Sequence, residues 1–296
     1  MTVSPAPVSG LVTTGSYTAG NVPSRSRRGQ PSSAGRYDYL LGRNDNTAAD
    51  QASAAAITDF LPTAALAARA NRRFVWNAAS DLAGAGIGQF IDIGTGIPAL
   101  PDISGPHIHN CVHWKNHHAP VVYVDNDPHV VDLARSRLIN QPGRGQITVL
   151  HGDLRDPDDI LTRAVEQGGL DPRRPIGILL TAVLHYLPDD DRPYERLREL
   201  VATLPARSAL VISHLSLDLL PTGLHSQVPD IIAASGIPAF PRPLAEISRF
   251  FDGLKLTTPG IIAVHRYRSR PYERSRFELL PDTAVGLYCG IGRKPD

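Results

Sequence analysis

A glycine-bearing turn follows a short apolar run in the stretch QFIDIGTGIPALPD, residues 89–102. Glycine lets a loop backbone approach a ligand where a Cβ would collide, so Gly94 and Gly96 indicate a binding loop. Asp92 stands before both glycines and Pro98 follows them. A dinucleotide loop instead reads G-x-G-x-x-G and holds pyrophosphate at a helix N-terminus. A carboxylate at the turn would repel pyrophosphate and attract a cation, so this loop favours a positively charged ligand.

Two further carboxylates end the next two expected strands. Asp125 closes APVVYVD (119–125), and Asp153 closes GQITVLHGD (145–153). The carboxyl ends of parallel strands meet at one sheet edge, where doubly wound folds bind ligands, so these acids should share a crevice with Asp92. Asp125 could accept both hydroxyls of a ribose, and Asp153 the exocyclic amine of an adenine. S-adenosylmethionine offers an adenosyl group, a sulfonium and an ammonium without phosphate, and this pattern favours it. The alternative is that the three acids only cap helices and turns.

Strands and helices alternate along the chain from about residue 87. Continuous apolar runs, typical of strands buried on both faces of a parallel sheet, lie at 88–93, 119–125, 145–153, 175–187 and 208–216. Helices are expected in DPHVVDLARSRL, DPDDILTRAVEQ and DDDRPYERLRELVATLP. FFDGLKLTTPGIIAVHRYR and AVGLYCGIGRK have no full helix between them, which indicates an antiparallel pair at one sheet edge. The predicted fold is α/β and doubly wound, with a mostly parallel seven-stranded sheet and an antiparallel C-terminal edge strand.

The N-terminal part of the chain lacks this alternation. Residues 1–34 are rich in Ser, Pro, Gly and Thr without periodicity, and a disordered tail is expected there. Residues 35–86 should form a helical extension, with two Ala-rich helices separated by Pro62. Its segment RYDYLLGRNDN could be a helix-capping turn, or a lid over the ligand with Tyr37 and Tyr39 as walls.

Charge and composition limit the partners of the protein. The formal net charge is +1 and basic residues form no block, which argues against nucleic acid or an anionic membrane as the main partner. No apolar run approaches the roughly 20 residues of a membrane span, and no signal-peptide core is visible. Cys111 and Cys289 are too few for a disulfide framework and favour a reducing compartment. We therefore expect a cytoplasmic protein with a small-molecule partner, either as a monomer or as a homodimer.

The densest polar cluster is HIHNCVHWKNHH, residues 107–118. On a continuous helix His109, His113 and His117 would share one face, a spacing that can suit a metal. The cluster has neither a carboxylate neighbour nor a second cysteine. We therefore expect an exposed helix wall and no metal site.

Several segments resemble one known family. They are YDYLLGRNDN (37–46), ANRRF (70–74), GIGQFIDIGTGIP (86–98), VVYVDNDP (121–128), GDLRDP (152–157), AVLHYLPDDD (182–191) and RFFDGLKLTTPG (249–260). In this order they resemble the class I S-adenosylmethionine-dependent methyltransferases. More narrowly, they resemble an actinobacterial S-adenosyl methyltransferase family once catalogued as a domain of unknown function. The resemblance implies that residues 87–296 bind S-adenosylmethionine and transfer its methyl group, in a setting of secondary metabolism.

The resemblance also implies a role for each strand end. The methionine end of the cofactor would lie among Asp92, Gly94, Thr95 and Gly96. The ribose would contact Asp125 and Asn126, and the adenine would lie between Asp153 and Leu154. Thr181 and Ala182 would face the sulfonium. The family commonly reads G-G-K-D-N where this chain has Gly42, Arg43, Asn44, Asp45 and Asn46, so any role of that lysine's ammonium is lost here.

Chemistry beyond cofactor binding concerns the acceptor of the methyl group. His185, at the end of the fourth expected strand, is a candidate general base, or else a packing residue that shapes the pocket. Tyr186 is expected as core or pocket wall, and residues 217–243 as an acceptor-binding insertion.

Two other functions remain open at this point. One is a regulatory protein that binds S-adenosylmethionine without catalysis. The other is a nicotinamide dehydrogenase, against which Asp92 counts. The chain also has no lysine between Lys115 and Lys255 for a Tyr-x-x-x-Lys pair.

Overall fold

A mostly parallel sheet forms the centre of the molecule. The computed structural model describes residues 29–99, 106–138, 143–267 and 280–296. Its strands are β1 (Phe90–Ile93), β2 (Val121–Asp125), β3 (Ile147–His151), β4 (Gly177–Thr181), β5 (Ala209–Leu215), β6 (Lys255–Leu256), β7 (Ile262–Ala263) and β8 (Leu287–Arg293). The order across the sheet is β3-β2-β1-β4-β5-β8-β6, and β7 also pairs with β8. β1 to β5 are parallel, and β8 is antiparallel to β5, β6 and β7. The expected fold class is confirmed.

The sheet has eight strands rather than the predicted seven. The segment expected as one long strand is broken into β6 and β7 by residues 257–261, where the Thr258–Pro259 peptide bond is cis. Pro259 cannot donate a ladder hydrogen bond, so pairing with β8 stops there and resumes at Ile262. The antiparallel pair at the edge is confirmed, but β8 itself lies one place inside, with β6 and β7 at the edge.

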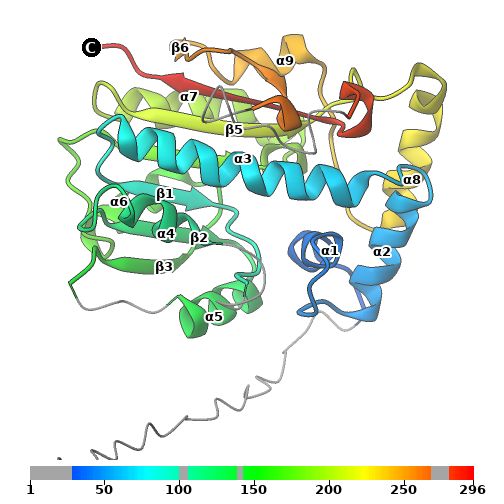
Figure 1. The fold of residues 1–296 in the computed structure, drawn as a ribbon, viewed down its shortest axis with the longest axis horizontal. Coiled ribbons are helices and arrows are strands. Elements are labelled where there is room, and N and C mark those ends of the chain that lie inside the picture. Colours follow the sequence, from blue (N-terminus) through cyan, green and yellow to red (C-terminus); the bar gives the residue numbers. More distant parts are fainter. Residues whose placement is uncertain (1–28, 100–105, 139–142, 268–279) are drawn as a thin grey trace, which may run out of the picture.

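Helices cover both faces of the sheet. They are α1 (Ser33–Leu40), α2 (Ala48–Thr58), α3 (Ala64–Gly84), α4 (Ile108–His113), α5 (Pro128–Arg137), α6 (Pro157–Glu166), α7 (Pro193–Thr203), α8 (Val228–Ser235) and α9 (Leu244–Arg249). Figure 1 shows α3 running across one face. Phe90 belongs to the core cluster with α3 and α4 on that face, whereas Ile91 belongs to the cluster with α6, α7 and the turn after α9 on the other. Burial on both sides explains why β1 and β2 are continuously apolar before their terminal or near-terminal acids.

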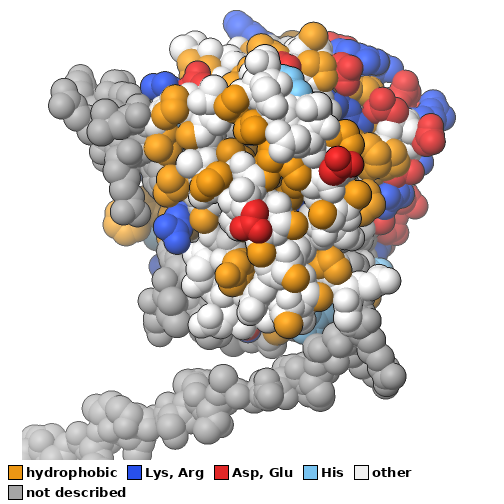
Figure 2. All heavy atoms as spheres, turned by 90° about the vertical axis from the view of Figure 1, so that its right-hand side faces the viewer, with side chains coloured by type: hydrophobic (Ala, Val, Ile, Leu, Met, Phe, Trp, Pro, Cys, Tyr) orange, Lys and Arg blue, Asp and Glu red, His pale blue; other side chains and the backbone are white. Residues whose placement is uncertain are grey.

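The helices α1, α2 and α8 gather at the end of the sheet where the parallel strands finish (Figure 1). α2 begins at a capping box in which Thr47 and Asp50 exchange hydrogen bonds. α8 comes from the segment 217–243, far away in sequence, and packs against α2. Figure 2 shows this end from outside: hydrophobic and uncharged side chains cover most of it, and the charged ones gather mainly to one side.

The N-terminal extension contains one helix that the sequence did not predict. α1 begins at Ser33, inside the stretch expected as a tail, and Ser32 caps it by accepting from the Gly35 amide. The expected tail lies outside the described residues as far as residue 28. The two Ala-rich helices on either side of Pro62 are α2 and α3, as expected. No helix in the described ranges is long and apolar enough to cross a bilayer.

Candidate functional site

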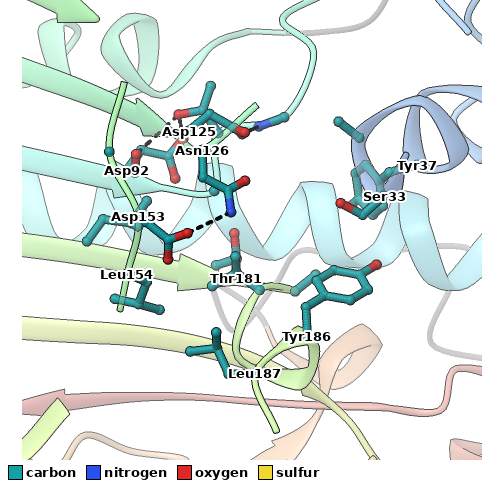
Figure 3. A pocket seen from close by; sticks show the side chains of 18 of the residues that line it. Ser33, Tyr37, Asp92, Asp125, Asn126, Asp153, Leu154, Thr181, Tyr186 and Leu187 are labelled. Atoms are coloured by element: carbon teal, nitrogen blue, oxygen red, sulfur yellow. Dashed lines mark hydrogen bonds between the residues drawn. The ribbon is translucent and has the colours of Figure 1, made fainter. Parts of the chain in front are cut away.

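A cleft lies at the carboxyl ends of β1, β2, β3 and β4 and faces α1, with α3 running behind it (Figure 3). Counted with its open mouth, it contains about 1090 Å³ of empty space. The residues proposed from the sequence that line it are Asp92, Gly94, Thr95, Gly96, Asp125, Asn126, Asp153, Leu154, Thr181, Ala182, Tyr37 and Tyr186. Tyr39 does not line it and is 42% exposed, and His185 lines a neighbouring cavity instead.

The loop after β1 is shaped by its two glycines. Gly94 has φ +76°, and a Cβ there would collide with Cγ2 of Val183. Gly96 has φ +65° with open space around it, so its need for glycine is conformational. The Gly96 amide donates to Oδ2 of Asp125 at 2.9 Å. The loop after β1 is thereby joined to the end of β2.

Asp92 is a buried acid at the floor of the cleft, 4% exposed. Burial raises its pKa to about 7, with a smaller contribution from the negative charge of Asp125. The positive charge of Arg72 and a hydrogen bond from Thr95 oppose this rise. Near neutral pH the carboxyl is therefore close to half protonated, and a cation bound beside it would favour its ionised form.

Arg72 is a site residue that the sequence reasoning missed. It reaches the cleft from α3, and its guanidinium carbon lies 5.9 Å from the centre of the Trp76 ring. Its Nε is buried and has no hydrogen-bond partner among the described residues. An anionic group in the cleft would meet this charge. The signal in the sequence was the segment ANRRF, which was noted for the resemblance alone.

The Asp125 carboxylate is held in one orientation by two backbone amides. Gly96 donates to Oδ2, and Asp127 donates to Oδ1 at 3.0 Å. Burial raises the pKa of Asp125, while these two N–H groups oppose the rise. Each carboxylate oxygen can still accept a second hydrogen bond from a ligand hydroxyl.

Asp153 lies at the rim of the cleft and is bonded to two neighbours. Asn126 donates its amide to Oδ2 at 3.1 Å (Figure 3). The Arg155 amide donates to Oδ1 at 2.9 Å, and its guanidinium lies 3.1 Å from Oδ2. Although burial raises the pKa of Asp153, the bonds from Arg155 and Asn126 hold it below its ordinary value. The side chain is thus an ionised acceptor at the edge of the cleft.

A buried chain of hydrogen bonds fixes the end of β4. Ala182 has φ +56°, in the left-handed region, and its amide donates to Oγ of Ser213 at 2.9 Å. The Ser213 hydroxyl donates to Oδ1 of Asn71 at 2.6 Å, and the Asn71 amide donates to the Tyr37 hydroxyl at 3.0 Å. Tyr37 in turn donates to the carbonyl of Ala68. The Tyr37 hydroxyl therefore already has both an acceptor and a donor, and its ring serves as a wall.

A second, mostly apolar cavity adjoins the cleft and contains about 950 Å³ with its open mouth. Ser33, Tyr37, Ala182 and Tyr186 line both spaces. The remaining wall comes from α1, α2 and the turn after it, α3, the turn after β4, the end of β5, the segment 217–243 and the start of β8 with the loop before it. Its residues are Arg36, Leu40, Ile57, Phe60, Leu61, Ala64, Ala67, Ala68, His185, Leu215, Leu217, Leu220, Val228, Ile231, Ile232, Pro241, Val285 and Leu287. The segment expected to bind the acceptor thus contributes to this wall.

His185 is poorly suited to be a base in this setting. Its Nδ1 accepts the Leu215 amide at 3.4 Å. Burial lowers its pKa well below the ordinary value, helped by the nearby positive charges of Arg36 and Arg242 and by His214. A neutral imidazole with Nδ1 engaged carries its proton on Nε2 and has no free lone pair. This geometry agrees better with the packing role.

The turn that follows α1 touches the loop after β1. Arg43 donates to the carbonyl of Ile97 at 3.2 Å, and Arg137 donates to the carbonyl of Pro98 at 2.7 Å. Arg137 also forms two hydrogen bonds with the Asp45 carboxylate, both 2.7 Å. Arg43 thus connects the N-terminal extension to the loop after β1.

The histidine-rich segment does not form the expected exposed helix wall. α4 ends at His113, so His117 is not on that helix. His109 bonds the Tyr123 hydroxyl through Nδ1, and His113 bonds the Ala119 carbonyl through Nε2, both at 2.9 Å. Burial is the first cause that lowers the pKa of His109 to about 3. These two side chains are buried and form hydrogen bonds in the core. The four-residue spacing of the histidines could not show that this face of the helix is buried.

Comparisons with known proteins agree with this geometry. A family model described as S-adenosyl methyltransferase matches residues 21–295. A DUF574 family protein from Streptomyces avermitilis is 33% identical with a TM-score of 0.81, covering 90% of this chain and 98% of its own. A candidate methyltransferase from Thermobifida fusca is also 33% identical, with a TM-score of 0.76, covering 90% and 96%. No curated protein is significantly similar to the chain.

A match over nearly the whole length, with the acids and glycines of the cleft at the strand ends, identifies the chain as a member of the S-adenosyl methyltransferase family, whose cofactor is S-adenosylmethionine.

Proposed function

We propose that this enzyme transfers a methyl group in line from S-adenosylmethionine in the cleft to a small hydrophobic molecule in the adjoining cavity. The observation that carries this proposal is the wall shared by the two spaces, formed by Ser33, Tyr37, Ala182 and Tyr186. In-line displacement needs the nucleophile and the leaving sulfur on opposite sides of one carbon. Two spaces that meet at Ala182 can provide this arrangement. The bound cofactor would supply the electrophilic methyl group on its sulfonium.

The methionine end of the cofactor fits the pair of Asp92 and Arg72. Asp92 is a buried acid whose pKa is raised to about 7, and an ammonium beside it would offset the cost of its burial. Arg72 has an unpartnered Nε that a carboxylate could accept from. An α-amino acid carries both of these charges. We propose that these two side chains hold it, with Gly94 and Thr95 contributing the nearby backbone.

The adenosine end fits the side chains after β2 and β3. Asp125, oriented by the Gly96 amide, would accept the ribose hydroxyls together with Asn126. Asp153 is an ionised acceptor at the cleft edge, suited to the exocyclic amine of adenine, and Leu154 would cover the ring. Thr181 and Ala182 then lie toward the sulfonium.

The N-terminal extension would act as a lid that limits access of water. Tyr37 lines both spaces, and Arg43 contacts the loop after β1. Tyr39 lines neither space, so the proposed lid uses Tyr37 alone.

The proposed setting is cytoplasmic secondary metabolism in an actinobacterium. A hydrophobic acceptor and the free cysteines Cys111 and Cys289 are compatible with it.

Turnover in a cavity-filling variant tests the proposal. Ala67→Leu, on the wall of the second cavity, should abolish methyl transfer to any acceptor found in a hydrophobic metabolite panel. Its calorimetric affinity for S-adenosylhomocysteine should stay unchanged. The matched control is Ala65→Leu. Ala65 lies two residues earlier on α3, on a different face of the helix, and lines neither space, so this variant should keep turnover.

The possible results separate the functions. Binding of S-adenosylhomocysteine without turnover on any acceptor would favour the non-catalytic alternative. An unaffected turnover in Ala67→Leu would place the acceptor elsewhere and contradict the proposal.

A further inference from the structure

We infer that the acceptor is a hydrophobic carboxylate and that Arg36, together with Tyr186, binds its anionic group in the second cavity. This inference rests on the proposed function and names its substrate class. The juxtaposition behind it is a buried guanidinium in a mostly apolar cavity that adjoins the proposed cofactor cleft.

Arg36 is buried, with 8% of its surface exposed. Its Nη1 donates to the hydroxyls of Ser235 at 3.2 Å and Ser53 at 3.5 Å. Its Nη2 donates to the Tyr186 hydroxyl at 3.1 Å. A guanidinium has five N–H donors, so two of them have no partner among the described residues. All three partners are neutral hydroxyls, which leaves the positive charge without a counter-ion.

Nearby acids do not supply that counter-ion. Asp50, on the adjacent helix α2, accepts from Ser32 and Thr47. Asp38, on α1 itself, accepts from the amide of Asp45 and the side chain of Asn46. No acid of the described chain lies within salt-bridge distance of Arg36 or lines the second cavity. Burying a charge is costly unless it is paired, so an anionic ligand group is what this cavity favours.

The described lining residues of the cavity offer no available general base, so the nucleophile must already be deprotonated when it binds. His185, the titratable neighbour in this cavity, is neutral, and its Nδ1 is occupied by the Leu215 amide. The Tyr37 hydroxyl is already bonded on both sides. A carboxylate is ionised at neutral pH and needs no proton removed, unlike an alcohol or an ammonium. The absence of an available base among the described lining residues therefore agrees with an acid as acceptor.

Tyr186 places this anion beside the methyl group. It lines both spaces, and its hydroxyl accepts from Arg36, which leaves its own proton free to donate to a carboxylate. One carboxylate oxygen forms the new O–CH₃ bond while the C–S bond breaks and its electron pair stays on sulfur. The products are a neutral methyl ester and a neutral thioether, and no proton is transferred.

A purely structural role for Arg36 is the competing explanation, because Ser53 and Ser235 join it to α2 and α8. The two explanations differ in ligand preference. A structural brace would not make the cavity prefer an anion over a neutral molecule of the same shape.

The experiment measures ligand affinity by calorimetry on protein saturated with S-adenosylhomocysteine. The ligands are decanoate, decanamide, decanol and decylamine, together with naphthoate and its amide. Each carboxylate should bind at least about tenfold more tightly than its amide, as expected for charge-assisted hydrogen bonds. Arg36→Met should remove this preference and leave the amide affinity unchanged. Arg36→Lys should keep part of it. Ser235→Ala, which removes a brace bond but no charge, is the matched control and should keep the full preference.

Three results would overturn the inference: amides or amines that bind as tightly as the carboxylates, an unchanged preference in Arg36→Met, or amine methylation in place of methyl ester formation in a mass-spectrometric assay. If Arg36→Met fails to fold, the wild-type preference and Arg36→Lys still decide. Saturating the protein requires a first titration with S-adenosylhomocysteine, and this step separates the two proposals. A failure at that step refutes the cofactor site, whereas cofactor binding without carboxylate preference refutes only the acceptor class.

Discussion

Replacing Asp92 with asparagine should make the ligand-free protein more stable and its cofactor affinity less dependent on pH. The side chain is 4% exposed, and burial is the main cause that raises its pKa from 3.8 to about 7. At about 1.4 kcal/mol for each unit of pKa, ionised Asp92 destabilises the fold by about 4 kcal/mol. Asparagine keeps the shape without the charge, so it should recover much of this free energy.

The sign of the pH dependence follows from proton linkage. The folded protein binds the Asp92 proton more tightly than the unfolded chain, since the pKa is raised to about 7. Its contribution to stability is therefore fully present below pH 3.8 and is lost as the pH rises through about 7. In urea unfolding, the stability advantage of Asp92→Asn should grow by about 2–3 kcal/mol between about pH 5 and about pH 8.

Cofactor binding should show the opposite trend. The proposed ammonium contact needs the ionised carboxylate, so affinity for S-adenosylhomocysteine should fall about tenfold from about pH 8 to about pH 6. Methylthioadenosine has no amino acid group and should bind with little change over the same range. Arg72, Thr95 and Asp125 are the polar neighbours that act on Asp92, and Asp125→Asn is the control that should keep the trend.

Calorimetry in buffers of different ionisation enthalpy checks the same point, because binding near neutral pH should release a proton. A wild-type affinity for S-adenosylhomocysteine that is flat over this range, together with a constant stability difference from Asp92→Asn, would refute the reasoning.

Three further substitutions test other parts of the site. Arg72→Gln should weaken S-adenosylhomocysteine by about 1.5–3 kcal/mol through the lost charge-assisted bond and leave methylthioadenosine unchanged; equal losses for both ligands would contradict the carboxylate contact. Gly94→Ala should lower cofactor affinity and stability because its Cβ meets Val183 at a positive φ, and Val183→Ala should partly restore both in a thermal melt. Arg242→Leu should cost about 2–5 kcal/mol in urea unfolding, since the buried carbonyls of Leu184 and Leu187 lose their donor, whereas a loss below this range would refute its anchoring of the loop after β4.

The acids of the cleft could be found from the sequence because of topology. Parallel strands bring their carboxyl ends to one edge, so Asp92 and Asp125 had to lie close together once their strands were recognised. Arg72 and Arg36 could not be found in this way. Their positions depend on how α3 crosses the sheet and how α1 packs on α2. The periodicity of apolar residues within one helix predicts neither.

Short elements were the other source of error. α1 has eight residues with Gly35 among them, and contacts with Asp50 help to hold its start, so local propensity alone predicts it poorly. The segment of β6 and β7 has an apolar pattern typical of one strand, yet Pro259 divides it. The histidines were misjudged because burial depends on Tyr123 and Ala119, which lie on the neighbouring strand and the turn before it.

The wall shared by the cleft and the cavity has a thermodynamic consequence. α1 presents Ser33 and Tyr37 to both spaces, so ligands bound in the two spaces would contact the same helix. Any free energy that the acceptor gains from the presence of the cofactor must equal what the cofactor gains from the acceptor. The same reciprocity governs the products. If the two products stabilise each other, departure of either one weakens the binding of the other by the same factor.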